Sequence, residues 1–279
     1  MRRRAFLALP ALAGPAACGL DGAGGAGGAG GAGAAGGGRP VSTPGTRRIG
    51  YGDHPAQYAE LTRPPGTPRG AAVVVHGGFW KPQYGIEYAR PLVPSLVTAG
   101  WAVWAIEYRR GTGAADTLAD VRAAIDALPD ARPEDAGPVV GIGHSAGGHL
   151  VTWAAGGGGL THVVSQAGVL DLRSAYELGL GGGAVEAFLG HPPGPADAAV
   201  DPIRQVPLAV PVWCVHGAAD DVVPIGQSEA YVAAARSAGA VAELVRVAGD
   251  HFAVVDPDSP AWDRTLEILR AIPDEPAAG

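Results

Sequence analysis

The chain has 279 residues, of which 47% are hydrophobic and 17% are charged, and its formal net charge is −7. This length and hydrophobic content suit one large α/β domain or two small ones. The sparse, acidic charge excludes nucleic acid as a main partner, because phosphate binding needs clustered Lys and Arg. Two cysteines, Cys18 and Cys214, are too few for a disulfide framework or a cysteine-based zinc site.

Residues 1–18 have the pattern of an export signal. MRRRAFLALPALAGPAAC has a positive start, an apolar stretch too short for a membrane span, and small residues before Cys18. RRAFL resembles the twin-arginine motif, and small residues followed by Cys resemble a bacterial lipoprotein cleavage site, although Pro15 stands where a leucine-like residue is usual. We therefore expect export, lipidation of Cys18 and an anchor on the extracytoplasmic side of a bacterial membrane. The alternatives are an ordinary signal peptide, or a cytoplasmic enzyme with a mis-called start.

Residues 19–45 are predicted to be a linker. From Gly22 to Gly38 the sequence contains only Gly and Ala, which cannot bury a core and have no side chains to fix a conformation. The linker is therefore expected to be a flexible tether, and the folded domain to span residues 46–279.

From about Thr46 the chain alternates short apolar strands with helical segments. TRRIGYG and QYAELTRP predict an antiparallel pair of edge strands. Next come predicted strands at 71–76 and 101–109, a helix at 117–128, a strand at 138–143, a helix from about Ala146 and a strand at 162–168. The last predicted elements are a strand at 211–216, a helix at 228–239, a strand at 242–247 and a helix at 261–272.

This order of elements predicts an α/β fold. Continuous apolar strands with helices between them indicate a mostly parallel central sheet with helices on both faces. Between Asp171 and Val206 the pattern weakens into Gly- and Pro-rich sequence, which predicts a small loop-rich cap insertion rather than a second domain. An insertion this short excludes a large lid for long-chain lipids and favours small, soluble substrates.

A serine boxed in by glycines follows the strand at 138–143. GHSAG (143–147) fits G-x-S-x-G, in which a sharp turn presents Ser145 as a nucleophile and directs the N–H of Ala146 at a developing oxyanion. Gly141, Gly143 and Ala146 also fit the dinucleotide-binding fingerprint G-x-G-x-x-A. That fingerprint normally opens the first βαβ unit, whereas strands already precede it here, and Asp171 is the only candidate for its ribose-binding acid. A tight turn without a function is the third interpretation.

Two further strand ends carry loops suited to the same chemistry. In VHGGFW (75–80), the glycines allow the N–H groups of Gly78 and Phe79 to face outward as oxyanion donors. In VHGAADDVVP (215–224), Asp220 stands where an acid can orient a histidine, and Asp221 is the competing candidate. Each stretch alone would be explained by a glycine turn or a helix cap.

A fourth strand end, GDHF (249–252), supplies a histidine. His251 suits a general base near neutral pH, although a lone histidine here would be read as a surface residue. The order Ser145, acid, His251 is the chain order of a hydrolase triad. No H-E-x-x-H motif or carboxylate-rich loop is present, so no metal site is predicted.

Six stretches together resemble the esterase/lipase branch of the α/β-hydrolases that includes kynurenine formamidase-like (arylformamidase-like) enzymes. They are VVVHGGFW, IEYRR, GHSAGGHL, SQAGVLDL, HGAADDVVP and GDHFAVVDP, and the resemblance covers roughly Tyr51 to Ile272. It implies the α/β-hydrolase fold and a triad of Ser145, Asp220 and His251. It also implies oxyanion donors at Gly78, Phe79 and Ala146. The chain departs from the pattern at Asp201–Pro202, where Ser-Pro is expected.

The resemblance implies a serine hydrolase that needs no metal or organic cofactor and forms an acyl-enzyme with a small-molecule ester or amide. We expect a carboxylesterase. The alternatives are an arylformamidase (kynurenine formamidase) type amide hydrolase and a non-catalytic binding protein with a hydrolase fold. Export favours the esterase, because N-formylkynurenine is a cytosolic metabolite. Phe79, Trp80, Tyr84 and Tyr88 either line an aromatic-tolerant pocket or only pack. The oligomeric state stays open.

Overall fold

The computed structural model describes residues 45–128 and 137–274, which fall within one compact unit of the chain, Pro40–Gly279. The predicted export signal, Cys18 and all of the predicted linker except its last residue therefore lie outside the described residues.

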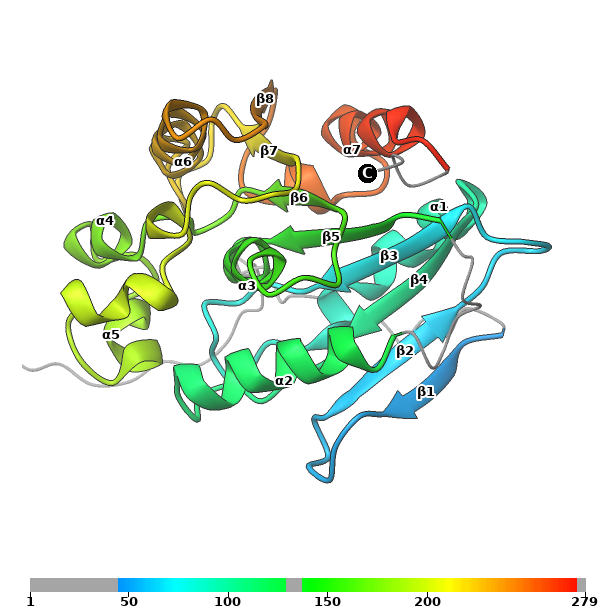
Figure 1. Cartoon of the computed structure of the whole chain (residues 1–279), viewed down its shortest axis with the longest axis horizontal. Helices are drawn as coiled ribbons and strands as arrows, with labels where there is room; N and C mark the ends of the chain where they lie inside the picture. The colour runs from blue at the N-terminus through cyan, green and yellow to red at the C-terminus, as the bar shows by residue number, and fades with distance from the viewer. Residues whose placement is uncertain (1–44, 129–136, 275–279) are drawn as a thin grey trace, which may run out of the picture. The chain divides into compact units, whose positions relative to one another are not determined.

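Eight strands form one twisted sheet in the order β1-β2-β4-β3-β5-β6-β7-β8 (Figure 1). β1 pairs with β2, and β2 with β4, in antiparallel register, and all other pairs are parallel. This confirms the predicted edge pair and the mostly parallel sheet. The strands are β1 (Arg47–Gly50), β2 (Tyr58–Thr62), β3 (Gly70–Val75), β4 (Trp101–Ile106), β5 (Val139–His144), β6 (His162–Gln166), β7 (Val212–Gly217) and β8 (Ala242–Val247).

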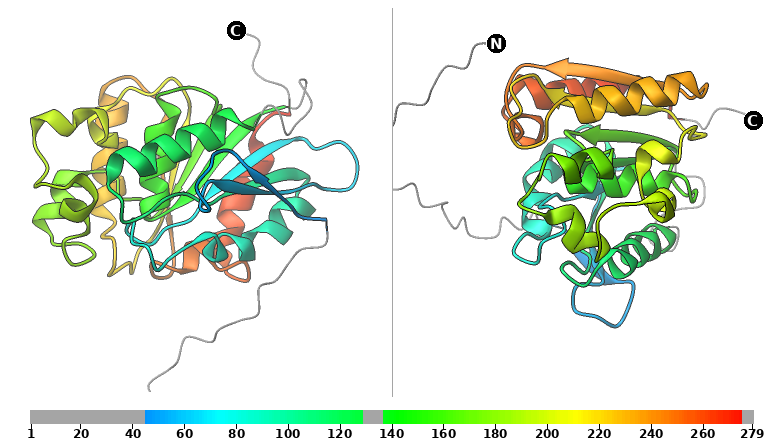
Figure 2. Two further views of the ribbon diagram at one scale, coloured as in Figure 1. Left: turned by 90° about the horizontal axis from the view of Figure 1, so that it is seen from below. Right: turned by 90° about the vertical axis from the view of Figure 1, so that its left-hand side faces the viewer.

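Helices cover both faces of the sheet, as the apolar strands predict. β3 and β4 are buried along their whole length, so neither face of these strands meets water. One core contains residues of α2 (Ala114–Asp126), α3 (Ala146–Ala155) and α6 (Gly226–Ser237). The other contains residues of α1 (Val93–Thr98) and α7 (Pro260–Ala271). Figure 2 shows these helices on the two sides of the strands.

The stretch between β6 and β7 is more helical than its composition predicts. Where we expected loops, the chain forms α4 (Leu172–Glu177), α5 (Ala184–Leu189) and two 3₁₀ helices, η4 (Pro195–Ala199) and η5 (Pro202–Arg204). Glycines with positive φ at positions 179 and 181–183 make the turn between α4 and α5. In Figure 1 these helices lie beyond the end of the sheet to which β5 and β6 point.

The remaining described elements are short. The 3₁₀ helices η1 (Ile86–Tyr88) and η2 (Arg90–Leu92) follow β3, and η6 (Ala253–Val255) follows β8. No helix in the described residues is long and apolar enough to cross a membrane. Cys214 is fully buried in β7, and burial raises the pKa of its thiol to about 12, which agrees with an inert thiol.

Candidate active site

The turn between β5 and α3 is strained at Ser145, which has φ 55° and ψ −119°. A positive φ is costly for a residue with a side chain and marks functional sites. The flanking glycines are required by close backbone approach. A Cβ on Gly143 would lie 2.1 Å from the carbonyl oxygen of Gly147, and a Cβ on Gly147 would lie 2.1 Å from that of Val75. These glycines therefore leave room for a strained elbow at Ser145.

Asp171, the candidate ribose-binding acid of the dinucleotide-binding interpretation, has a structural role. The Asp171 carboxylate caps α4, where its Oδ1 accepts a hydrogen bond from the N–H of Ser174 at 2.9 Å. Capping explains an aspartate at this position without a ribose.

The loop after β3 holds three successive residues with positive φ. They are Gly78 (115°), Phe79 (51°) and Trp80 (56°). The N–H groups of Gly78, Phe79 and Ala146 donate to no acceptor within residues 45–128 and 137–274. Unpaired N–H groups on a strained loop beside a strained serine can stabilise a negative oxygen.

Asp220 holds His251. Its Oδ2 accepts a hydrogen bond from Nδ1 of His251 at 2.7 Å, and its Oδ1 accepts from the N–H groups of Val222 and Val223 at 2.9 and 2.8 Å. Burial raises the pKa of Asp220, but the hydrogen bonds from the histidines and from Val223 outweigh it and hold the pKa well below its usual range. Asp221, the competing candidate, is exposed and has no hydrogen bond or ion pair in the described part of the chain.

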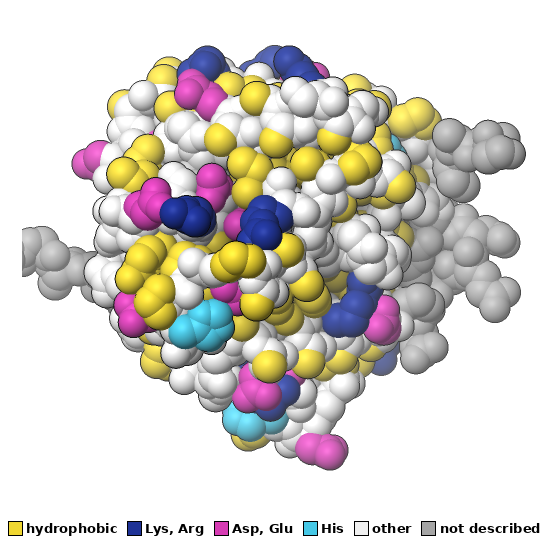
Figure 3. All heavy atoms as spheres, turned by 60° about the vertical axis from the view of Figure 1, so that its left-hand side comes forward, with side chains coloured by type: hydrophobic (Ala, Val, Ile, Leu, Met, Phe, Trp, Pro, Cys, Tyr) yellow, Lys and Arg dark blue, Asp and Glu magenta, His cyan; other side chains and the backbone are white. Residues whose placement is uncertain are grey.

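Ser145 and His251 line the same cavity, whose volume is about 190 Å³. Much of its lining is apolar and comes from β3, β5 and the 3₁₀ helices; it includes Val74, Leu92, Ile142 and Val255. Phe79, Tyr84, Tyr88 and Phe252 also line it, and Tyr88 and Phe252 are 53% and 59% exposed. Figure 3 brings this end of the sheet forward and shows hydrophobic side chains exposed between single acidic and basic ones.

The four aromatic residues after the predicted oxyanion loop divide between the two expected roles. Phe79, Tyr84 and Tyr88 line the cavity. Trp80 does not, because it is buried against the insertion, where it stacks on Phe188 with ring centroids 4.4 Å apart.

Because His144 directly precedes the nucleophile, it is expected to pack or form a hydrogen bond near it, and the structure places it against His251. Its Nε2 lies 2.9 Å from the carbonyl oxygen of His251, and the two rings are 4.5 Å apart. Burial lowers the pKa of His144 to about 3, so the ring is neutral and carries its proton on Nε2 to donate this hydrogen bond. His144 therefore steadies the loop that carries His251.

His216 is a histidine to which the sequence alone assigns no role. Its Nε2 lies 2.8 Å from the carbonyl oxygen of Val223 and 3.2 Å from Oδ2 of Asp220. Its Nδ1 lies 2.8 Å from Oγ of Ser228. The only sequence signal for His216 is its place at the end of a strand.

Gln166 reaches the cavity from β6. Its main-chain carbonyl accepts a hydrogen bond from the N–H of Ser145 at 2.8 Å, which ties the elbow to the neighbouring strand. Its amide nitrogen donates to the carbonyl of Val254 at 2.6 Å. Within the described residues, no group of three or more His, Cys, Asp or Glu side chains could hold a metal ion.

The comparisons with known proteins concern the family and the fold of the chain. A model of the BD-FAE family matches residues 61–234, whereas no curated protein matches the chain. A truncated carbohydrate esterase from gut microbiota is 20% identical, with a TM-score of 0.69 over 80% of this chain and 94% of that one. A putative thioesterase from Silicibacter sp. TM1040 is 23% identical, with a TM-score of 0.66 over 82% and 86%. Thermogutta terrifontis esterase 2, phosphoramylated by tabun, is 25% identical, with a TM-score of 0.66 over 83% and 94%.

Proposed function

This chain belongs to the BD-FAE family, and from that premise we propose that it is a serine hydrolase that cleaves small carboxylic esters. The observation that carries the proposal is the hydrogen bond from His251 to Asp220, because His251 lines the same cavity as the strained Ser145. A carboxylate-held imidazole and a presented hydroxyl are the parts needed for acyl transfer.

In the proposed mechanism, Nε2 of His251 takes the proton of the Ser145 hydroxyl as the oxygen attacks the ester carbonyl. Asp220 keeps Nδ1 protonated and stabilises the imidazolium that forms. The N–H groups of Gly78, Phe79 and Ala146 receive the oxyanion. His251 then gives its proton to the leaving alcohol, and water cleaves the acyl-enzyme by the same steps.

Cavity shape and lining support a small substrate. The cavity that Ser145 lines has mostly apolar walls, which suit a short acyl or aryl group. The exposed rings of Tyr88 and Phe252 could stack on a sugar or an aromatic ring in the part of the substrate that stays outside. The carbohydrate esterase among the similar structures makes sugar esters a substrate class to test.

The first prediction concerns Ser145. Ser145→Ala should lower kcat for p-nitrophenyl acetate about 10⁴-fold or more, because it removes the attacking oxygen. A fluorophosphonate probe should label wild-type protein on Ser145, as found by peptide mass mapping, and leave the variant unlabelled. Full activity of Ser145→Ala would contradict the assignment. A wild-type protein that is neither labelled nor active would favour the non-catalytic binding protein.

The same assay separates the two substrate classes. Purified protein is tested side by side on p-nitrophenyl acetate, an acetylated xylo-oligosaccharide and N-formylkynurenine. We expect kcat/KM to be highest for an ester. A far higher value for N-formylkynurenine would replace the esterase by an arylformamidase.

We further propose that the protein is exported and anchored through lipidated Cys18. The proposal rests on the sequence of residues 1–18 and on the Gly- and Ala-rich stretch that follows it.

A further inference from the structure

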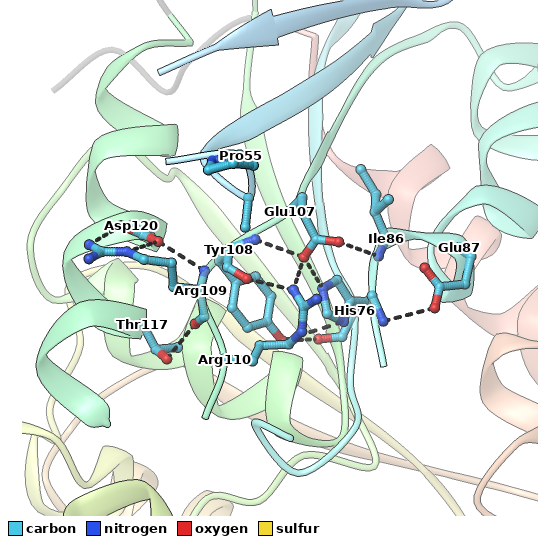
Figure 4. A network of polar contacts seen from close by, with 12 residues as sticks. Pro55, His76, Ile86, Glu87, Glu107, Tyr108, Arg109, Arg110, Thr117 and Asp120 are labelled. Atoms are coloured by element: carbon cyan, nitrogen blue, oxygen red, sulfur yellow. Dashed lines mark hydrogen bonds and ion pairs between the residues drawn. The ribbon is translucent and has the colours of Figure 1, made fainter. Parts of the chain in front are cut away.

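A buried polar network lies directly behind the predicted oxyanion loop. Figure 4 shows Glu107 between the ring of His76, the guanidinium of Arg110 and the N–H of Ile86. The side chain of His76 is fully buried and that of Glu107 is 8% exposed. The triad mechanism gives these residues no task, yet His76 lines the cavity next to Ser145.

The oxygen nearest each ring nitrogen of His76 can only accept a hydrogen bond. The Tyr108 hydroxyl also lies 3.5 Å from Nδ1, but it donates its proton to the carbonyl of His76. Nε2 lies 3.1 Å from Oε1 of Glu107, and Nδ1 lies 2.8 Å from the main-chain carbonyl of Gly77. Burial raises the pKa of Glu107, but its hydrogen bonds with His76 and the N–H of Ile86 and the nearby charges lower it below its usual value, so Glu107 is ionised. The contact with Gly77 is a hydrogen bond only if Nδ1 carries a proton.

That hydrogen bond sets the orientation of the next peptide group. The Gly77–Gly78 peptide is trans, so the C=O of Gly77 and the N–H of Gly78 lie in one plane and point in opposite directions within it. A carbonyl held by His76 therefore turns the N–H of Gly78 away from the ring. This peptide lies against the elbow, since a Cβ on Gly77 would be 3.0 Å from Cβ of Ser145.

The rest of the network holds the ring in place. Glu107 also accepts hydrogen bonds from the N–H groups of Ile86 and Tyr108 at 3.0 and 2.9 Å. The Tyr108 hydroxyl donates to the carbonyl of His76 at 2.8 Å, and its ring stacks on that of His76 with centroids 4.4 Å apart. His76 is thus fixed on two sides.

We propose that His76, held by Glu107, is a positioning residue that fixes the Gly77–Gly78 peptide and so aims the N–H of Gly78 at the oxyanion. The inference rests on the proposed function, because it assigns the oxyanion donors of that same site.

Two substitutions of His76 test this, because each keeps one of its nitrogens. In His76→Asn the amide nitrogen can take the place of Nδ1 and still donate to Gly77. In His76→Gln it takes the place of Nε2 and reaches only Glu107. We expect His76→Gln to lose about 10–100-fold in kcat with little change in KM, and His76→Asn to retain most of kcat, since losing one oxyanion donor costs on the order of 10²–10³. His54→Phe, on an exposed loop, is the control and should match wild type.

A trifluoromethyl ketone, whose adduct with serine carries an oxyanion, gives the second readout. Its affinity should fall in parallel with kcat in His76→Gln, while thermal unfolding midpoints stay close to wild type. Equal kcat in both variants, or lost kcat with unchanged inhibitor affinity, would overturn the inference. If both variants unfold, kcat and inhibitor affinity are measured in Glu107→Gln instead. Values equal to those of wild type in Glu107→Gln would also overturn the inference. An inactive wild-type protein would instead refute the proposed function.

Discussion

At the scale of single residues, the chemistry depends on glycines as much as on the triad. Gly147 packs so tightly against β3 that a methyl group there would meet the carbonyl oxygen of Val75 at 2.1 Å. Neither backbone can move far, because each lies in a buried element. The position of Ser145 is therefore set by the absence of a side chain two residues later.

Gly147→Ala should consequently lower kcat by about 10²-fold, since displacing a reacting group by roughly 1 Å costs that much. It should also reduce the free energy of unfolding by about 1–3 kcal/mol through overpacking. Gly226→Ala is the matched control, because Gly226 begins α6 with nothing within 4 Å of its added Cβ. Its kcat should equal that of wild type. Wild-type kcat in Gly147→Ala would show that the elbow tolerates movement.

At the scale of elements, the insertion between β6 and β7 supports the predicted oxyanion loop. Lys81 donates a hydrogen bond from Nζ to the carbonyl of Gly181 at 2.7 Å. The Phe79 ring packs so closely on the same turn that a Cβ on Gly181 would lie 2.7 Å from it. The turn between α4 and α5 therefore contacts the loop that carries the proposed oxyanion donors.

Asp201, where the chain departs from the Ser-Pro pattern, gives the insertion a pH-dependent stability. Its Oδ1 accepts a hydrogen bond from the N–H of Leu172 at 3.1 Å, and burial raises the pKa of the carboxyl from 3.8 to about 6. The folded protein thus binds this proton more tightly than the unfolded chain. The stabilisation that the protonated Asp201 carboxyl gives to the folded protein is complete below about pH 4, and it is lost as the pH rises to about 6.

Asp201→Asn keeps an acceptor for Leu172 but carries no charge. Above pH 6 the variant should be more stable than wild type by about 1–3 kcal/mol, and the difference should vanish near pH 4. Chemical denaturation at pH 4 and pH 8 measures it. Asp258→Asn, which changes an exposed carboxylate, is the control and should show no such difference. Equal stability of Asp201→Asn and wild type at pH 8 would contradict the role of burial.

At the scale of the whole molecule, the elements that build the site all lie within the compact unit Pro40–Gly279. A protein beginning at Pro40 should therefore fold and keep the kcat/KM of the full chain. In a bacterial host, the full chain should sediment with membranes and carry a lipid on Cys18, whereas Cys18→Ala should not. Mass spectrometry of the mature N-terminus checks this. Membrane association of Cys18→Ala equal to that of wild type would contradict the proposed anchor.

The strands, the helices α2, α3, α6 and α7 and the elbow motif could be predicted from the sequence, whereas the short helix α1 was not predicted. Periodicity and Gly-x-Ser-x-Gly spacing are local signals, and the boundaries they predict agree with the structure to within a few residues at most elements. The insertion was predicted less well, because its short helices are stabilised by contacts such as the Asp201–Leu172 hydrogen bond. Propensity alone does not favour helices of six residues.

The sequence by itself determined which chemistry-bearing residues stand at strand ends, because parallel strands place their carboxyl ends at one edge. Only the tertiary structure decided that Asp220 rather than Asp221 contacts His251, and that Trp80 packs while Tyr84 lines the cavity. It also placed His76 on the carbonyl of Gly77. These choices depend on burial and on contacts between strands far apart in the chain, which no local pattern encodes.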